Sequence, residues 1–263
     1  MSILLPIIIL SAMGVVFGLG LAFASKAFDV KQDERIEAIR GILPGANCAA
    51  CGYSGCDGYA FAIVEGEATP SLCPVGGQPL ADSIGTVMGV KAGAVTAKVA
   101  RVKCGGGEKA CKRMYDYKGI QDCAAVKLLH GGQYNCDISC EGFGNCVKAC
   151  EYDAIYINEG GVADVIAARC VACGKCAKAC PKNLIDVVPV ESFYTVRCSS
   201  NDRGVDIRKA CGVGCIGCGR CVKTCLYNAI RVENNLAAID PYKCTNCGEC
   251  AKACPRKCIV FYE

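Results

Sequence analysis

Residues 170–181 read CVACGKCAKACP and residues 244–255 read CTNCGECAKACP, so a C-x2-C-x2-C-x3-C-P pattern occurs twice. Three thiolates at these intervals can bind three iron corners of one 4Fe-4S cube, because a short loop returns them to the same side. The fourth cysteine then points at a neighbouring cube. A further run of cysteines precedes each copy, at 136–150 and at 211–225. The pattern therefore predicts two pairs of cubes in tandem.

The spacing is typical of bacterial two-cluster ferredoxins, in which paired motifs exchange their last ligand. It predicts an α+β fold with two tandem double-cluster ferredoxin modules, over residues 134–190 and 191–263. The ligand groups expected in the first module are Cys170, Cys173 and Cys176 with Cys150, and Cys136, Cys140 and Cys146 with Cys180. Those expected in the second module are Cys244, Cys247 and Cys250 with Cys225, and Cys215, Cys218 and Cys221 with Cys254.

The two copies differ at one ligand position, where Phe143 stands in place of Cys218. The first copy must then recruit Cys136, unless a ligand comes from farther along the chain. The spacing Cys123-x12-Cys136 matches Cys198-x12-Cys211, which predicts that Cys123 and Cys198 are equivalent. The cysteines left over could hold a sixth cluster if the fold brings them together, or could pack as reduced thiols. They are Cys104, Cys111, Cys123, Cys198 and Cys211, while Cys258 is expected only to pack.

A smaller cysteine module precedes the ferredoxin motifs. Its four cysteines follow the spacing C-x2-C-x4-C-x16-C, at Cys48, Cys51, Cys56 and Cys73. Glycines between them supply the tight turns that a cube requires, and the segment after Cys56 is expected to be helical. We therefore expect a 4Fe-4S module over 28–80 and at least five clusters in all. A zinc site is the alternative, because C-x2-C pairs also bind zinc.

Residues 3–25 carry no charge, which predicts a membrane-spanning helix within 1–27. A signal peptide would need positive charge before its apolar run, whereas Lys26, Lys31 and Arg35 follow it here. The positive-inside rule then places the rest of the chain on the cytoplasmic side of the inner (cytoplasmic) membrane, as a single-pass protein. Thiols stay reduced in that compartment, which favours clusters over disulfides. Residues 81–133 are expected to be a spacer with additional cysteines.

The composition indicates that inorganic clusters replace much of an ordinary core, since 263 residues include 26 Cys, 31 Gly and no Trp. The formal charge of +4 counts thiols as neutral, so the loaded protein is expected to be anionic and not to bind nucleic acid. His130 is expected to be a surface residue. We find no nucleotide-binding glycine loop and no hydrolytic triad, so no catalytic residue is predicted.

The apolar N-terminal segment, the segment LPGANCAACGYSGC at 43–56 and the tandem ferredoxin motifs together resemble the iron–sulfur B subunit of the Rnf complex, the ion-translocating ferredoxin:NAD oxidoreductase. The chain is similar to the cluster-rich form found in anaerobes. The resemblance implies that electrons pass from soluble ferredoxin to membrane and flavin-bearing partner subunits, in a complex that reduces NAD and moves Na+ or H+. The order of the modules predicts that residues 198–263 meet the donor. A polyferredoxin arm of a membrane hydrogenase or another dehydrogenase is the alternative.

Overall fold

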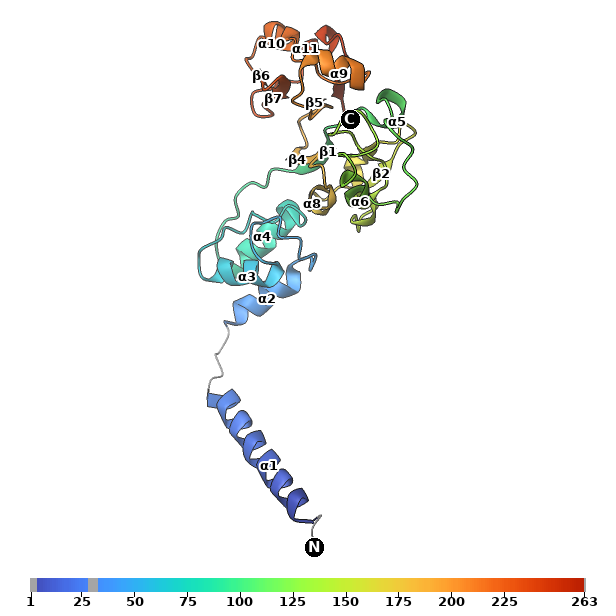
Figure 1. The fold of residues 1–263 in the computed structure, drawn as a ribbon. Helices are drawn as coiled ribbons and strands as arrows, with labels where there is room; N and C mark the ends of the chain where they lie inside the picture. Colours follow the sequence, from blue (N-terminus) through green and yellow to red (C-terminus); the bar gives the residue numbers. More distant parts are fainter. Residues whose placement is uncertain (1–3, 28–32, 263) are drawn as a thin grey trace.

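The computed structural model describes residues 4–27 and 33–262, and Lys31 lies outside these residues. The fold is α+β, with an N-terminal apolar helix, a small helical module and two modules of short helices and two-stranded sheets. Figure 1 shows that the three modules follow one another in chain order, with the C-terminal module farthest from the N-terminal helix. Every one of the 26 cysteines lies in the described residues as a free thiol.

The first helix, α1 (Leu4–Ala27), is long and apolar enough to cross a membrane. Its segment Ile7–Ala24 has a mean hydropathy of 2.5, and the large apolar side chains from Ile7 to Phe23 are exposed. A helix of this length rises by roughly 35 Å, which is enough to cross the hydrocarbon core of a bilayer.

Three helices form the small module that follows. They are α2 (Glu34–Ile42), α3 (Cys56–Val64) and α4 (Gly77–Met88). The side chain of Asp33 accepts a hydrogen bond from the Arg35 N–H and so caps α2. The buried side chains of Ile39, Tyr59 and Ile84 join the three helices in one core. The helix that the sequence predicts after Cys56 is confirmed as α3.

The first ferredoxin module has two antiparallel strand pairs. The strand β1 (Lys98–Val102) pairs with β4 (Ile185–Pro189), and β2 (Ile155–Ile157) pairs with β3 (Ala163–Val165). Its short helices are α5 (Gly107–Ala110), α6 (Cys123–Lys127), α7 (Asn145–Lys148) and α8 (Lys175–Ala179), with a 3-10 turn η1 (Ala167–Arg169). The prediction of a spacer over 81–133 is therefore wrong from Lys98 onward, because β1 pairs with β4 in this module.

The second ferredoxin module repeats this layout. Its strand pairs are β5 (Tyr194–Val196) with β8 (Ile259–Phe261), and β6 (Ile230–Glu233) with β7 (Leu236–Ile239). Its helices are α9 (Gly204–Ala210), α10 (Arg220–Thr224) and α11 (Glu249–Ala253). Asn234 and Asn235 form the hairpin turn between β6 and β7, and both have left-handed backbone angles, with φ of 49° and 64°.

The repeat also shows which cysteines are equivalent. Cys104 lies two residues beyond β1, and Cys198 lies two residues beyond β5. Because β1 and β5 occupy the same place in their modules, Cys104 is the counterpart of Cys198. The prediction that Cys123 is that counterpart is wrong. Cys123 instead begins α6, in an insertion between β1 and the first motif.

Candidate iron–sulfur sites

Two pockets contain the thiols of the C-x2-C-x2-C motifs. Each is lined by three motif thiols and by one thiol from the preceding cysteine run. In the first module the lining thiols are Cys170, Cys173, Cys176 and Cys150. In the second module they are Cys244, Cys247, Cys250 and Cys225. The structure therefore brings together, in both modules, the groups that the exchange of last ligands predicts.

A third pocket lies in the second module on the other side of the paired motifs. Its thiols include Cys215, Cys218, Cys221 and Cys254. Cys218 is exposed, whereas Cys215 and Cys221 are buried. The pocket therefore contains the predicted group, with Cys258 as a fifth lining thiol. The two pockets of the module are linked through the chain, because Cys225 and Cys254 each line the pocket of the other motif.

The fourth pocket, in the first module, differs from the prediction. It is lined by Cys123, Cys140, Cys146 and Cys180, whereas Cys136 lies in a separate buried group with Cys111 and Cys211. The grouping of Cys136 with Cys140 and Cys146 is therefore wrong. Cys136 is four residues before Cys140 and lies on the side of the loop that faces the second module. Cys123 comes from the insertion and supplies the fourth thiol of the pocket, because Phe143 stands where the second module has Cys218.

Hydrogen bonds hold Cys123 at this pocket. The Asp122 side chain accepts from the N–H groups of Ala124 and Ala125 and so caps α6. Asn145, beside Cys146, accepts from the Cys123 N–H at 3.0 Å and donates to Asp122 at 2.7 Å. To locate this thiol from the sequence, one would have had to recognise that Asp122 and Asn145, 23 positions apart, are hydrogen-bonded to each other.

The N-terminal module places its cysteines around the start of α3. Cys51 and Cys56 pack against the buried core that contains Cys73. The charges of Cys51 and Cys48 raise the pKa of the Cys73 thiol, after burial, the largest cause. Cys56 is the first residue of α3, and its N–H donates to the Asn47 side chain at 2.9 Å. Gly55 turns the chain there with φ of 135°, where a Cβ atom would lie 2.9 Å from Asn47 Oδ1.

Several features of these pockets suit a 4Fe-4S cube. Backbone N–H groups donate to the sulfurs of Cys170, Cys150 and Cys180, each at 3.4 Å, from Ala100, Ala154 and Leu184. Such bonds stabilise thiolates that ligate a metal. Within residues 4–27 and 33–262 no three Cys, His, Asp or Glu side chains converge as the ligands of a single ion do. The thiols surround a volume instead, as the ligands at the corners of a cube must.

Close backbone contacts keep the ligand loops in place. Gly142 and Gly217 are equivalent residues with φ of 79° and 63°. A Cβ atom at Gly142 would lie 2.7 Å from the Gly161 carbonyl oxygen, and one at Gly217 would lie 2.7 Å from that of Asn235. Both oxygens belong to the hairpin turns. Only glycine therefore lets each ligand loop pack this closely on its hairpin.

A buried guanidinium within electrostatic range of Cys170 also suits a negatively charged group. Arg101 is 1% exposed, and among the described residues its Nε and Nη2 atoms have no hydrogen-bond partner. Burial lowers the pKa of Arg101, while the charges of Tyr262, Cys170 and Asp164 oppose that change. A cube held by four thiolates is anionic, so it would offset the cost of burying this cation.

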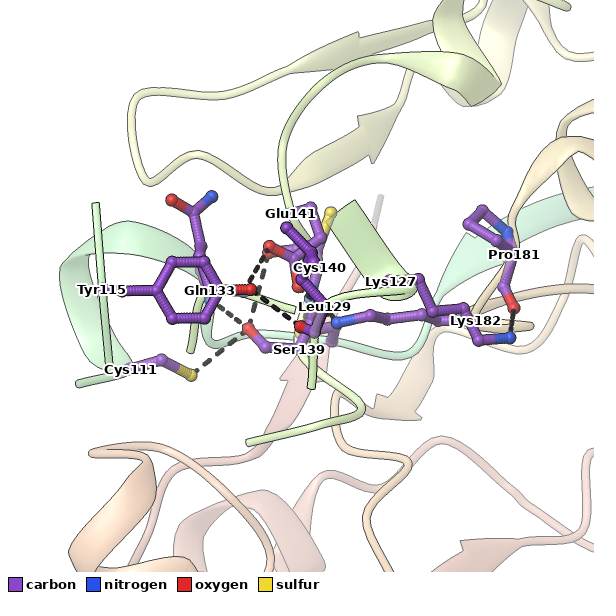
Figure 2. A network of polar contacts seen from close by, with 12 residues as sticks. Cys111, Tyr115, Lys127, Leu129, Gln133, Ser139, Cys140, Glu141, Pro181 and Lys182 are labelled. Atoms are coloured by element: carbon purple, nitrogen blue, oxygen red, sulfur yellow. Dashed lines mark hydrogen bonds and ion pairs between the residues drawn. The ribbon is translucent and has the colours of Figure 1, made fainter. Parts of the chain in front are cut away.

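A buried ion pair supports the loop that carries Ser139 and Cys140 (Figure 2). The Lys182 ammonium contacts the Glu141 carboxylate and donates to the Ser139 carbonyl oxygen at 2.8 Å. Both charged side chains are at most 3% exposed. Since Lys182 is the second residue after Cys180, the pair ties the two cysteine runs of this module together.

Family models match the same three regions. The model described as "Putative Fe-S cluster" matches residues 43–75, and the model described as "4Fe-4S dicluster domain" matches residues 135–184 and 214–258. Iron–sulfur and 4Fe-4S domains therefore cover the pocket thiols of all three modules except Cys123, which precedes residue 135.

Curated proteins match nearly the whole chain. The B subunit of the Na(+)-translocating ferredoxin:NAD(+) oxidoreductase complex of Acetobacterium woodii is 43% identical, over 98% of this chain and 78% of the relative. The B subunit of the ion-translocating oxidoreductase complex of Methanosarcina acetivorans is 40% identical, over 96% of both chains. The chain belongs to the Rnf B-subunit family. A further Rnf B subunit, from the proton-translocating complex of Clostridium ljungdahlii, is 38% identical over 92% of this chain and 86% of its own length.

Proposed function

We propose that this Rnf B subunit is the electron-transfer subunit of an ion-translocating ferredoxin:NAD oxidoreductase complex, and that it relays electrons from reduced ferredoxin to flavin-bearing and membrane partner subunits. The observation that carries the proposal is the arrangement of five thiol groups in series along one chain with an apolar N-terminal helix. When bound, 4Fe-4S clusters supply one-electron carriers of low potential at these groups.

The series begins at the N-terminal module, which lies against the first ferredoxin module. The Lys178 ammonium on α8 donates to the Cys48 carbonyl oxygen at 2.8 Å. The charge of Cys48 also raises the pKa of Cys173 after burial, the largest cause. The thiols of Cys48–Cys73 therefore lie next to the pocket of Cys170, Cys173 and Cys176. From there the exchanged cysteines, Cys150 and Cys180, connect this pocket to the next.

The residues of the chain hold the clusters and exclude water from them. Burial is the largest cause that raises the pKa of the Cys146 thiol, to about 12, and of the Cys250 thiol, to about 11. Such thiols would stay protonated without a metal, so they become thiolates only as ligands. Lys175 and Lys178, beside Cys176, supply positive charge that offsets part of the charge of the ligated cube.

The far end of the series has a surface suited to a soluble donor. Cys247, in the last pocket of the series, is exposed. On the segments that carry Cys225 and Cys244 of this pocket, Leu226 is 85% exposed and Tyr242 is 79% exposed. Lys223 and Lys243 are exposed on the same segments. Exposed apolar side chains beside cations fit an anionic protein partner, and a ferredoxin with thiolate-bound clusters is such a partner.

The near end of the series follows α1, which we propose lies in the cytoplasmic membrane with the modules on the cytoplasmic side. Arg35 and Arg40 of the described residues come shortly after the span, as the positive-inside rule requires for this orientation. The Cys48–Cys73 module would then deliver electrons to partner subunits at the bilayer.

The donor surface can be tested in the whole complex with a matched pair of variants. We expect Leu226→Glu to raise the KM for reduced ferredoxin by about tenfold, which corresponds to about 1.4 kcal/mol, with dithionite reduction of the clusters unchanged. Leu128→Glu is the control, because Leu128 is equally exposed, at 86%, but lies in the first ferredoxin module. Equal KM values in the two variants would place the donor elsewhere. A colourless, iron-free but folded chain would overturn the whole proposal.

A further inference from the structure

Five cysteines lie outside the N-terminal module and line none of the four cluster pockets, and all five are buried where the two ferredoxin modules meet. The junction is hydrogen-bonded through the backbone. Gly105 N–H donates to the Arg197 carbonyl oxygen at 2.9 Å, and Gly212 N–H donates to that of Ala110 at 2.7 Å. The buried cysteines at this junction are Cys104, Cys111, Cys136, Cys198 and Cys211.

Four of these thiols form two equivalent pairs. Cys104 follows β1 and Cys198 follows β5, so they are counterparts in the repeat. Cys136 is four residues before Cys140, and Cys211 is four residues before Cys215, so they are counterparts as well. Each module thus contributes the same two thiols to the junction. Cys111 lies in the insertion of the first module and has no counterpart in the second.

The hydrogen bonds to these sulfurs repeat in the same way. Cys140 N–H donates to Cys104 Sγ at 3.3 Å, and Cys215 N–H donates to the Cys198 thiol. Cys140 and Cys215 are themselves equivalent thiols of the flanking pockets. The N–H of Ile138 donates to Cys136, and that of its counterpart Val213 donates to Cys211. Backbone donors of this kind stabilise ligated thiolates.

The four thiols also lie close to one another. Cys136 and Cys211 belong to one buried group, and the hydrogen bond from Gly105 N–H to the Arg197 carbonyl oxygen joins the residues next to Cys104 and Cys198. The charges of Cys104, Cys211 and Cys198 also raise the pKa of Cys136, after burial, the largest cause. Cys136 is therefore within electrostatic range of all three other members. Four buried thiols that lie close together would repel one another as thiolates, unless a positively charged core lay between them.

We propose that Cys104, Cys136, Cys198 and Cys211 bind a further 4Fe-4S cluster at the junction of the two ferredoxin modules. Cys111 is a positioning residue: its thiol donates to Cys211, and it accepts from the Ser139 hydroxyl at 3.3 Å (Figure 2). The site lies between the pockets of Cys140 and Cys215. Its role as the link between the modules rests on the proposed electron relay, whereas its existence rests on the thiol geometry alone.

The site can be tested by counting iron and sulfide in the full chain, purified anaerobically in detergent. Five clusters correspond to about 20 irons per chain and six to about 24. We expect the higher number in the wild type, and a loss of about four irons in Cys104→Ala and in Cys198→Ala. The EPR signals of the other clusters should remain. Leu128→Ala is the control and should keep its iron, because Leu128 is 86% exposed and lines none of the thiol groups.

The outcomes separate this site from the proposed function. A wild type with about 20 irons, unchanged in Cys198→Ala, would overturn the junction site and leave the relay of five clusters intact. Loss of iron in Cys111→Ala but not in Cys198→Ala would overturn the ligand set. If an alanine variant fails to fold, the wild-type count still decides, since it needs no substitution.

Discussion

The two ferredoxin modules have the same strands and helices but obtain one thiol from different places. In the second module the loop of Cys215 and Cys221 carries the middle thiol itself, at Cys218. In the first module Phe143 occupies that position, and Cys123 reaches the pocket from an insertion. The comparison teaches that a ligand set is a property of the folded pocket. A contiguous motif is one way to supply it, and a distant segment is another.

Phe143 itself helps to place the distant segment. Its ring packs against Tyr117 of the insertion, with ring centroids 5.7 Å apart. The substitution that removes a thiol from the loop therefore also creates an aromatic contact that holds the replacement segment. The insertion therefore supplies both the thiol of Cys123 and the aromatic partner of Phe143.

The largest expected effect comes from removing the distant thiol. Cys123→Ala should lose the cluster of its pocket, about four irons per chain, as Cys218→Ala should in the second module. The measurement is iron and sulfide content together with EPR of the dithionite-reduced chain. Retention of full iron by Cys123→Ala would show that Cys123 is not a ligand.

A second prediction is that the first module can obtain its missing thiol from residue 143, as the second module does from Cys218. In the Cys123→Ala chain, the additional change Phe143→Cys should restore about four irons, because residue 143 occupies the position of Cys218. The double variant should remain less stable than the wild type, since the contact between Phe143 and Tyr117 is lost. Phe143→Ser in the same background is the control and should restore less iron. Equal iron in both double variants would contradict the equivalence of the two positions.

Much of the architecture follows from the sequence because cubes demand thiols at short, regular intervals. The groups around Cys173 and Cys247 were predictable for that reason, and the helix after Cys56 was predicted as well. The place of Cys123 was not, because it depends on how residues 105–135 fold back over the loop. Equal spacing also misled, since Cys123-x12-Cys136 imitates Cys198-x12-Cys211 although the strands show Cys104 to be the true counterpart.

A smaller effect on stability is expected from the two cations that follow the Cys-Pro pairs, Lys182 and Arg256. Lys182 is paired with buried Glu141, whereas the equivalent Arg256 donates only to backbone oxygens, those of Cys211 and Gly214. Lys182→Met would leave a buried carboxylate unpaired, so we expect a loss of about 3–5 kcal/mol of stability. Arg256→Met should cost less, because Ile216 stands where Glu141 does. The check is the temperature at which the visible cluster absorption bleaches. Equal losses would contradict a role for the ion pair.

The smallest expected effect concerns Cys258, whose counterpart in the first module is Leu184. The Cys258 sulfur lies 3.5 Å from Cys254 Sγ, and its thiol donates to Cys215, which lowers the pKa of Cys215. A donor to ligating sulfurs favours the reduced, more negative state of a cluster and so raises its potential.

Exchanging the two side chains tests this difference between the modules without removing any ligand. Cys258→Leu should lower the potential of the cluster held by Cys215 and Cys254, and Leu184→Cys should raise that of the cluster held by Cys140 and Cys180. Both variants should keep their full iron, and a redox titration followed by EPR measures the shifts. Loss of iron in Cys258→Leu would make Cys258 a ligand, and the modules would then differ at two ligand positions instead of one.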